Sequence, residues 1–139
     1  MKSKKLDITT SGATAVVALL KTETTETKER KQLIVGNVGD SRAVLVSSRS
    51  PANDATADAG VGNYYAHRLT YDHRADDKSE QKRIAEAGGF ISRNRVLGIL
   101  AVTRSFGDHG MKDFVTGSFA YFLIDWLLPA FLVANLKQI

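Results

Sequence analysis

Two apolar runs in the first third of the chain are the clearest feature of its hydrophobic pattern. They cover residues 13–20 and 33–38, and both contain several β-branched side chains. Short continuous runs of this kind are typical of strands that are buried on both faces. A third strand is expected at residues 43–46, after turn chemistry at Gly39-Asp40-Ser41. The three strands together predict an antiparallel meander.

The polar stretches between and after these strands are expected to be loops. Residues 21–31 are charged and rich in threonine, and residues 47–62 are rich in Ser, Ala, Asp, Asn and Gly. Such compositions are typical of solvated connections. We expect the second stretch to carry no chemistry.

A helix is expected to begin after Asp77. Glu80 follows three positions later, which resembles a capping box, and acidic residues suit the positive end of a helix dipole. Ile84 and Ala87 would form the inward face. The pair Gly88-Gly89 would end the helix, because glycine readily adopts the left-handed conformation found there.

Two short strands are expected after this helix, at residues 90–92 and 95–97, around a turn at Arg93-Asn94. Strands and helices therefore occur in runs and not in strict alternation. This order predicts an α+β fold.

The last part of the chain is apolar from residue 119 to residue 134, with interruptions at Asp125 and Pro129. A membrane-spanning helix needs about 20 consecutive apolar residues, so a membrane span is not favoured. A core helix, a pair of strands and an association-prone end stay open as alternatives.

Composition narrows the possible functions. With 139 residues the chain is about the size of one domain. Its net charge of +4 is mild and scattered, so no nucleic-acid partner is expected. There is no cysteine and no apolar N-terminal signal, which favours a cytoplasmic location, with the nucleus as an alternative.

Asp40 is the main candidate for site chemistry. A carboxylate at a turn between strands can reach into a cleft, where Mg²⁺ or Mn²⁺ would accept it as an oxygen ligand. Alternatively, Asp40 stabilises the turn by bonding to its own backbone.

Three other polar positions have structural interpretations beside catalytic ones. Asp72-His73 could act in proton transfer, but a polar turn between strand and helix is preferred. Arg104 could bind phosphate, but pairing with a nearby acid is preferred. His67 and His109 have no metal-ligand spacing, and surface or capping roles are expected for them. No catalytic residue is assigned.

Three motifs occur in a fixed order along the chain: LIVGNVGDSRAVL at residues 33–45, LTYDH at 69–73 and LAVTRSFGD at 100–108. Together they resemble the middle of a type 2C serine/threonine protein phosphatase, the metal-dependent PPM family, and the wording is closest to fungal members. The resemblance covers residues 12–117. We therefore expect residues 1–117 to be the central part of such a domain and residues 118–139 to be an apolar tail outside the family pattern.

The resemblance implies a β-sandwich flanked by helices, an αββα arrangement that would be incomplete here. It implies Mg²⁺ or Mn²⁺ as cofactors, hydrolysis of phosphoserine and phosphothreonine by metal-activated water, and phosphoprotein substrates. Stress-activated kinases are the expected partners. In the family, the aspartate that matches Asp40 lies at the edge of the metal centre, so Asp40 is predicted as a metal ligand.

The motifs that supply most metal ligands and the acid histidine in this family are missing from the sequence. They are Asp-Gly-His-Gly upstream, and Asp-Gly-Leu-Trp-Asp and Gly-x-x-Asp-Asn downstream. We therefore expect a phosphatase fragment that is inactive alone and does not bind metal firmly. The alternatives are a non-catalytic, pseudophosphatase-like module that binds a kinase or scaffold, and a translated fragment without function.

Overall fold

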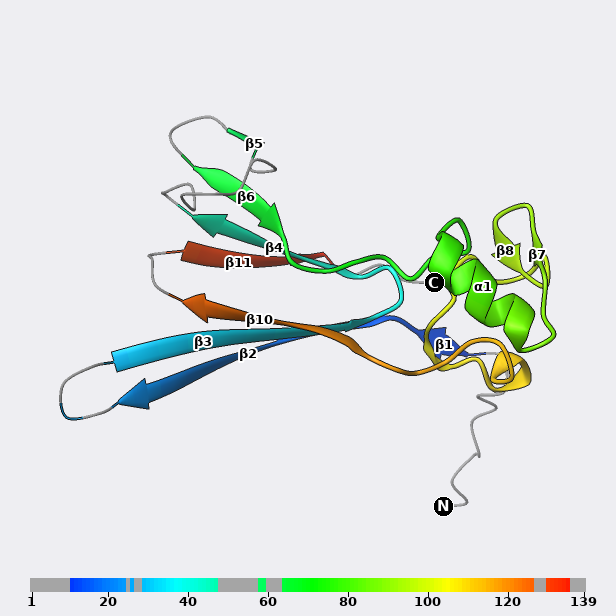
Figure 1. Cartoon of the computed structure of the whole chain (residues 1–139), viewed down its shortest axis with the longest axis horizontal. Helices are drawn as coiled ribbons and strands as arrows, with labels where there is room; N and C mark the ends of the chain where they lie inside the picture. Colours follow the sequence, from blue (N-terminus) through cyan, green and yellow to red (C-terminus); the bar gives the residue numbers. More distant parts are fainter. Residues whose placement is uncertain are drawn as a thin grey trace, which may run out of the picture.

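The computed structural model describes residues 11–24, 26, 29–47, 58–59, 64–126 and 130–135. Two antiparallel sheets lie at one end of the molecule, and a helix with short hairpins and turns lies at the other (Figure 1). Strands and a helix occur in runs, as the sequence predicted for an α+β fold.

The first sheet has the order β10-β3-β2 and contains β2 (Ala15–Thr24), β3 (Glu29–Val38) and β10 (Ala120–Trp126). The prediction of a loop at residues 21–31 is wrong, because β2 and β3 extend through most of it. Glu23 lies opposite Arg30 across the pair, and Lys21 makes an ion pair with Glu23 at 2.5 Å. Opposite charges facing each other stabilise a strand pair, so the charged stretch continues the hairpin.

The second sheet has the order β11-β4-β6-β5 and contains β4 (Arg42–Ser47), β5 (Asp58–Ala59), β6 (Tyr65–Arg68) and β11 (Ala130–Asn135). The prediction that the first three long strands form one meander is therefore wrong, because β4 belongs to a different sheet from β2 and β3. Most of the loop expected at residues 47–62 lies outside the described residues, but residues 58–59 form β5.

The chain changes sheets at the turn that the sequence predicted at residues 39–41. Gly39 has φ of +84°, and a Cβ there would lie 2.1 Å from Cγ2 of Thr14. Only glycine fits both the conformation and the space.

A hydrophobic cluster fills the space between the two sheets. It contains Leu33 and Val35 of β3, Ala43 of β4, and Leu69, with Val16, Leu45 and Ile124 packed against it. The prediction that residues 13–20 are buried on both faces is wrong. Val17 and Leu19 are 55% and 58% exposed on the open face of the edge strand β2, and Leu20, which lies opposite Leu33 and projects to the other face, is 52% exposed as well.

The helix α1 (Lys78–Glu86) begins and ends as predicted. Oδ1 of Asp77 accepts hydrogen bonds from the backbone N–H groups of Ser79 and Glu80 at 2.8 and 3.0 Å. Gly88 has φ of +83° and follows the helix end. Ile84 is fully buried, but Ala87 is exposed, so its predicted inward position is wrong.

The helix packs over a second hydrophobic cluster. Its buried members are Ala75, Ile84, Val96 and Val115. The predicted hairpin closes one side of it: β7 (Ile91–Ser92) pairs with β8 (Arg95–Val96), and Arg93 and Asn94 have the positive φ values of a tight hairpin turn.

A further strand pair joins the start of the described chain to the segment that follows Arg104. β1 (Gly12–Ala13) pairs with β9 (Phe106–Gly107), and a 3₁₀ turn (His109–Met111) follows.

The apolar tail forms strands, which was one of its three alternatives. β10 joins the first sheet beside β3, and β11 joins the second beside β4. Within the described residues, no helix has the length and apolar character needed to cross a membrane.

Candidate functional site

Asp40 lies in the turn between β3 and β4 and is only 7% exposed. Its Oδ2 accepts a hydrogen bond from Nη1 of Arg74 at 3.2 Å, and this contact is also an ion pair between the two side chains. The sequence analysis did not identify Arg74, because 34 residues separate it from Asp40 and no motif links the two. The carboxylate predicted as a metal ligand is thus paired with a guanidinium.

His73 holds the same turn from the other side. Its ring Nδ1 accepts a hydrogen bond from the backbone N–H of Gly39 at 3.1 Å, and the backbone N–H of His73 donates to the carbonyl of Gly39 at 3.0 Å. Burial, with the charge of Arg104, lowers the pKa of His73 below its usual value. A neutral imidazole that accepts a backbone bond holds the turn in place. Residues 72–73 lie in the connection between β6 and α1, where the preferred interpretation placed them.

Asp72 joins two strands of the second sheet. It accepts hydrogen bonds from Nε of Arg42 at 2.9 and 3.1 Å, and from Nη2 of Arg68 at 2.5 Å. Burial works to raise the pKa of Asp72, but the bonds from Arg42 and the charge of Arg68 outweigh it and hold the pKa below its usual value. Asp72 is therefore a charged structural link, with no free proton to transfer.

Arg104 pairs with an acid, as the preferred interpretation predicted. Its Nη2 donates to Oε1 of Glu80 at 2.6 Å, and its Nε donates to both carboxylate oxygens at 3.2 Å. Nη2 of Arg83 donates to the same carboxylate at 3.1 Å. Glu80 was expected only as part of a helix cap, and its role as the centre of this ion-pair network was missed.

Asp108 packs against the first described residues. Its N–H donates to the carbonyl of Ser11 at 2.8 Å, and its Oδ2 accepts from Oγ of Ser105 at 2.5 Å. A Cβ on Gly12 would lie 2.1 Å from that Oδ2, so a side chain at position 12 would displace the carboxylate of Asp108. These contacts place Asp108 in a corner that joins β1 to β9.

The two histidines for which surface or capping roles were expected, His67 and His109, lie elsewhere in the fold. His67 is within 3.5 Å of Oγ of Ser47 on the neighbouring strand, and His109 is exposed in the 3₁₀ turn.

The residues around Asp40 do not fit a two-metal centre. Divalent ions of this type need several oxygen ligands, and a pair of ions needs several carboxylates. Within the described parts of the chain, no three His, Asp or Glu side chains gather closely enough to hold a metal ion. The assignment of Asp40 as a ligand stays a prediction.

Comparison with known families gives the lineage. The family model described as Protein phosphatase 2C matches residues 1–124. The chain belongs to the protein phosphatase 2C family. The matched region extends past residue 117, and the expected division of the chain at residue 117 stays a prediction.

Curated relatives match about three quarters of this protein phosphatase 2C chain. The chain is 39% identical over 117 residues to Protein phosphatase 2C homolog 1 of Saccharomyces cerevisiae, covering 78% of this chain and 36% of the relative. It is 36% identical over 105 residues to the protein of that name in Schizosaccharomyces pombe, covering 76% and 25%. It is 42% identical over 106 residues to bovine Protein phosphatase 1L, covering 74% and 23%. The matched part is about a third or less of each relative's length.

Solved structures share the fold of this protein phosphatase 2C chain. A phosphatase from Toxoplasma gondii aligns with a TM-score of 0.54 at 20% identity, over 88% of this chain and 41% of the other. A C. elegans sex determining protein aligns with a TM-score of 0.52 at 21% identity, over 70% and 23%. The predicted partial α+β phosphatase fold is confirmed.

Proposed function

We propose that this chain forms the central part of a metal-dependent serine/threonine phosphoprotein phosphatase domain and has no phosphatase activity by itself. Family membership supports the phosphatase class. The observation that supports the lack of activity is that the buried carboxylate of Asp40 is already paired with Arg74. A phosphatase of this family uses metal-activated water, which calls for more carboxylates than Asp40 alone provides.

The proposed substrates are phosphoserine and phosphothreonine proteins, with stress-activated kinases among them, in the cytoplasm or nucleus. Mg²⁺ or Mn²⁺ would be the cofactor of the intact domain. In this proposal, the chain supplies the two-sheet core, the turn that contains Asp40 and the corner that contains Asp108.

The test is a phosphate-release assay on the purified chain with a phosphothreonine peptide and Mn²⁺. We expect release no faster than in the protein-free blank, and no difference between the chain and its Asp40→Asn variant. Release that Asp40→Asn abolishes would overturn the proposed inactivity. Calorimetric uptake of two tightly bound Mn²⁺ ions would overturn it as well.

A second candidate function is a non-catalytic module that binds a kinase or scaffold. It is favoured by ion pairs that link separate elements of the fold: Glu80 with Arg83 and Arg104, and Asp72 with Arg42 and Arg68. Retention of a purified stress-activated kinase on the immobilised chain, together with cooperative unfolding of the chain, would support this candidate. Lack of retention would count against it.

A further inference from the structure

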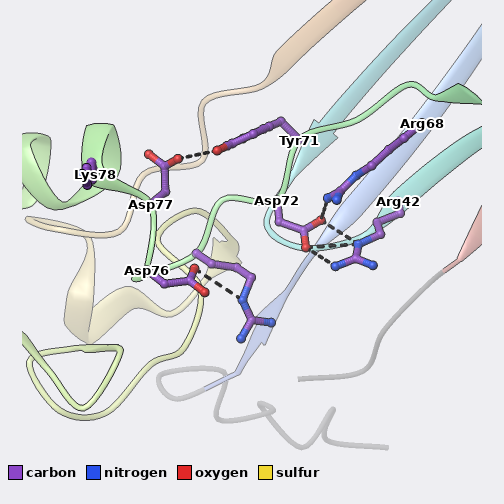
Figure 2. Close-up of a pocket in the computed structure, with 8 residues that line it drawn as sticks. Arg42, Arg68, Tyr71, Asp72, Asp76, Asp77 and Lys78 are labelled. Atoms are coloured by element: carbon purple, nitrogen blue, oxygen red, sulfur yellow. Dashed lines mark hydrogen bonds and ion pairs between the residues drawn. The ribbon is translucent and has the colours of Figure 1, made fainter. Parts of the chain in front are cut away.

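A polar pocket of about 760 Å³ opens between the second sheet and the start of α1. Figure 2 shows the side chains that line it, which come from β4, from the end of β6, from the connecting segment and from α1. The lining residues are Arg42, Arg68, Tyr71, Asp72, Arg74, Asp76, Asp77 and Lys78. Every one carries a charge or a hydroxyl group.

Two of the three carboxylates in this pocket are covered or hydrogen-bonded, whereas its cationic side chains are more exposed. The side chain of Asp72 is 10% exposed beneath Arg42 and Arg68, whose own side chains are 41% and 47% exposed. Asp77 is occupied by the N–H groups of α1 and by the hydroxyl of Tyr71, which donates to it at 2.7 Å. Four cations, against one largely exposed carboxylate at Asp76, make the accessible lining positive.

The three arginines of the pocket also have N–H groups that are not used in the bonds described above. Arg42 bonds through Nε and Nη2, and Arg68 bonds through Nε and Nη2. Arg74 bonds to Asp40 through Nη1, and its Nε faces Asp76 at 3.7 Å. One terminal nitrogen on each guanidinium therefore makes no bond within the described residues.

Lys78 adds a fourth positive group at the first position of α1. Its side chain is exposed, and none of the described residues pairs with it. Lysine here lies at the positive end of the helix dipole, where a bound anion would be favoured.

We propose that this pocket binds the phosphate group of a phosphorylated side chain on the peptide substrate, apart from any group being hydrolysed. A phosphate monoester carries close to two negative charges and three acceptor oxygens at neutral pH. Guanidinium groups bind such a group through paired N–H donors. The proposal rests on the proposed function for its substrate class, because a phosphoprotein phosphatase meets peptides of this kind.

The test is direct binding in EDTA, so that neither metal nor hydrolysis contributes. A fluorescein-labelled phosphothreonine peptide and its unphosphorylated counterpart are titrated with the purified chain, and anisotropy is recorded. We expect the phosphorylated peptide to bind at least tenfold more tightly, and rising salt to weaken this preference because the charges are exposed.

Two variants and one matched control place the binding in the pocket. Lys78→Glu and Arg68→Gln should each weaken phosphopeptide binding at least fivefold. Lys82→Glu makes the same charge change on α1 outside the pocket lining and should weaken it less than twofold. Thermal unfolding of each variant separates lost binding from lost folding, and Asp72 keeps its bond to Arg42 in Arg68→Gln.

Equal binding of the two peptides would overturn the proposal, as would an equal effect of Lys82→Glu and Lys78→Glu. Inorganic phosphate that binds as tightly as the phosphopeptide would assign the pocket to free phosphate and overturn its assignment to a peptide side chain. Because the assay contains no metal, it measures binding independently of hydrolysis. Phosphate release by the chain in a separate assay would overturn the proposed inactivity, and the binding result would be unchanged.

Discussion

Glu80 shows how burial and pairing decide the state of one side chain. The residue is 4% exposed, and burial alone would raise its pKa. The hydrogen bonds and charge of Arg104, aided by Arg83, outweigh this effect and lower the pKa from 4.5 to about 2. Since the folded pKa lies below the unfolded value, the stabilisation is complete above pH 4.5 and is lost as the pH falls toward 2.

Replacing Glu80 with Gln should lower the free energy of unfolding by about 3 kcal/mol at pH 7, because Arg83 and Arg104 would lose a buried partner. Urea unfolding followed by circular dichroism measures the loss. At pH 3 the gap between the chain and the variant should narrow by more than half. Glu86→Gln is the control, since Glu86 forms only an exposed pair with Lys82 at 3.8 Å, and it should cost less than about 0.5 kcal/mol. An equal loss in both variants would contradict the argument.

At this scale the sequence predicted Asp77 as a cap and Arg104 as the partner of an acid. It did not predict that the acid is Glu80, which lies 24 residues before Arg104. Spacing along the chain identifies neighbours within a helix turn. It carries no information on which charges folding brings together.

The helix α1 is an element whose ends are set by local chemistry. Asp77 accepts two backbone N–H groups at the start, and its pKa is lowered by hydrogen bonds from Ser79 and Tyr71. After the last turn, the N–H groups of Gly88 and Gly89 donate to Ala85 and Ile84 at 2.9 Å. Both signals were readable because they depend on residues close in sequence.

Replacing Asp77 with Ala should lower the free energy of unfolding by about 1 kcal/mol, because two N–H groups at the helix start lose their acceptor. Thermal unfolding of the chain and the variant measures the change. Asp76→Ala removes a neighbouring carboxylate that lies 3.7 Å from Arg74 and caps nothing, so it should have a smaller effect. A larger loss for Asp76→Ala would refute the assignment of the cap.

For the whole molecule, the main consequence of the fold is an open apolar face on the first sheet. Val17 of β2 and Tyr121 of β10 both lie beside Gly36, and Leu19 and Leu123 both lie beside Ile34. Residues opposite each other in an antiparallel sheet project to the same side. Tyr121 is 77% exposed and Leu123 is 58% exposed, so the two rows form a continuous apolar surface. Such surfaces, next to an edge strand, favour association.

We expect the purified chain to associate as its concentration rises, and Leu19→Lys to reduce that association severalfold. Light scattering over a concentration series measures it. Ala85→Lys, on the exposed side of α1, adds the same charge away from the sheet and should change little. Scattering that stays the same in Leu19→Lys would show that this face is not responsible.

The sequence by itself determined the local parts of this protein: the strand runs, the turn at Gly39, both ends of α1 and the hairpin at Arg93-Asn94. Each depends on backbone preference or on bonds between residues a few positions apart. The tertiary structure alone decided that β4 enters the second sheet, that β2 leaves one face open, and that Arg74 pairs with Asp40. These outcomes depend on which surfaces are buried and which charges meet across tens of residues, and both are settled only when the two sheets pack together.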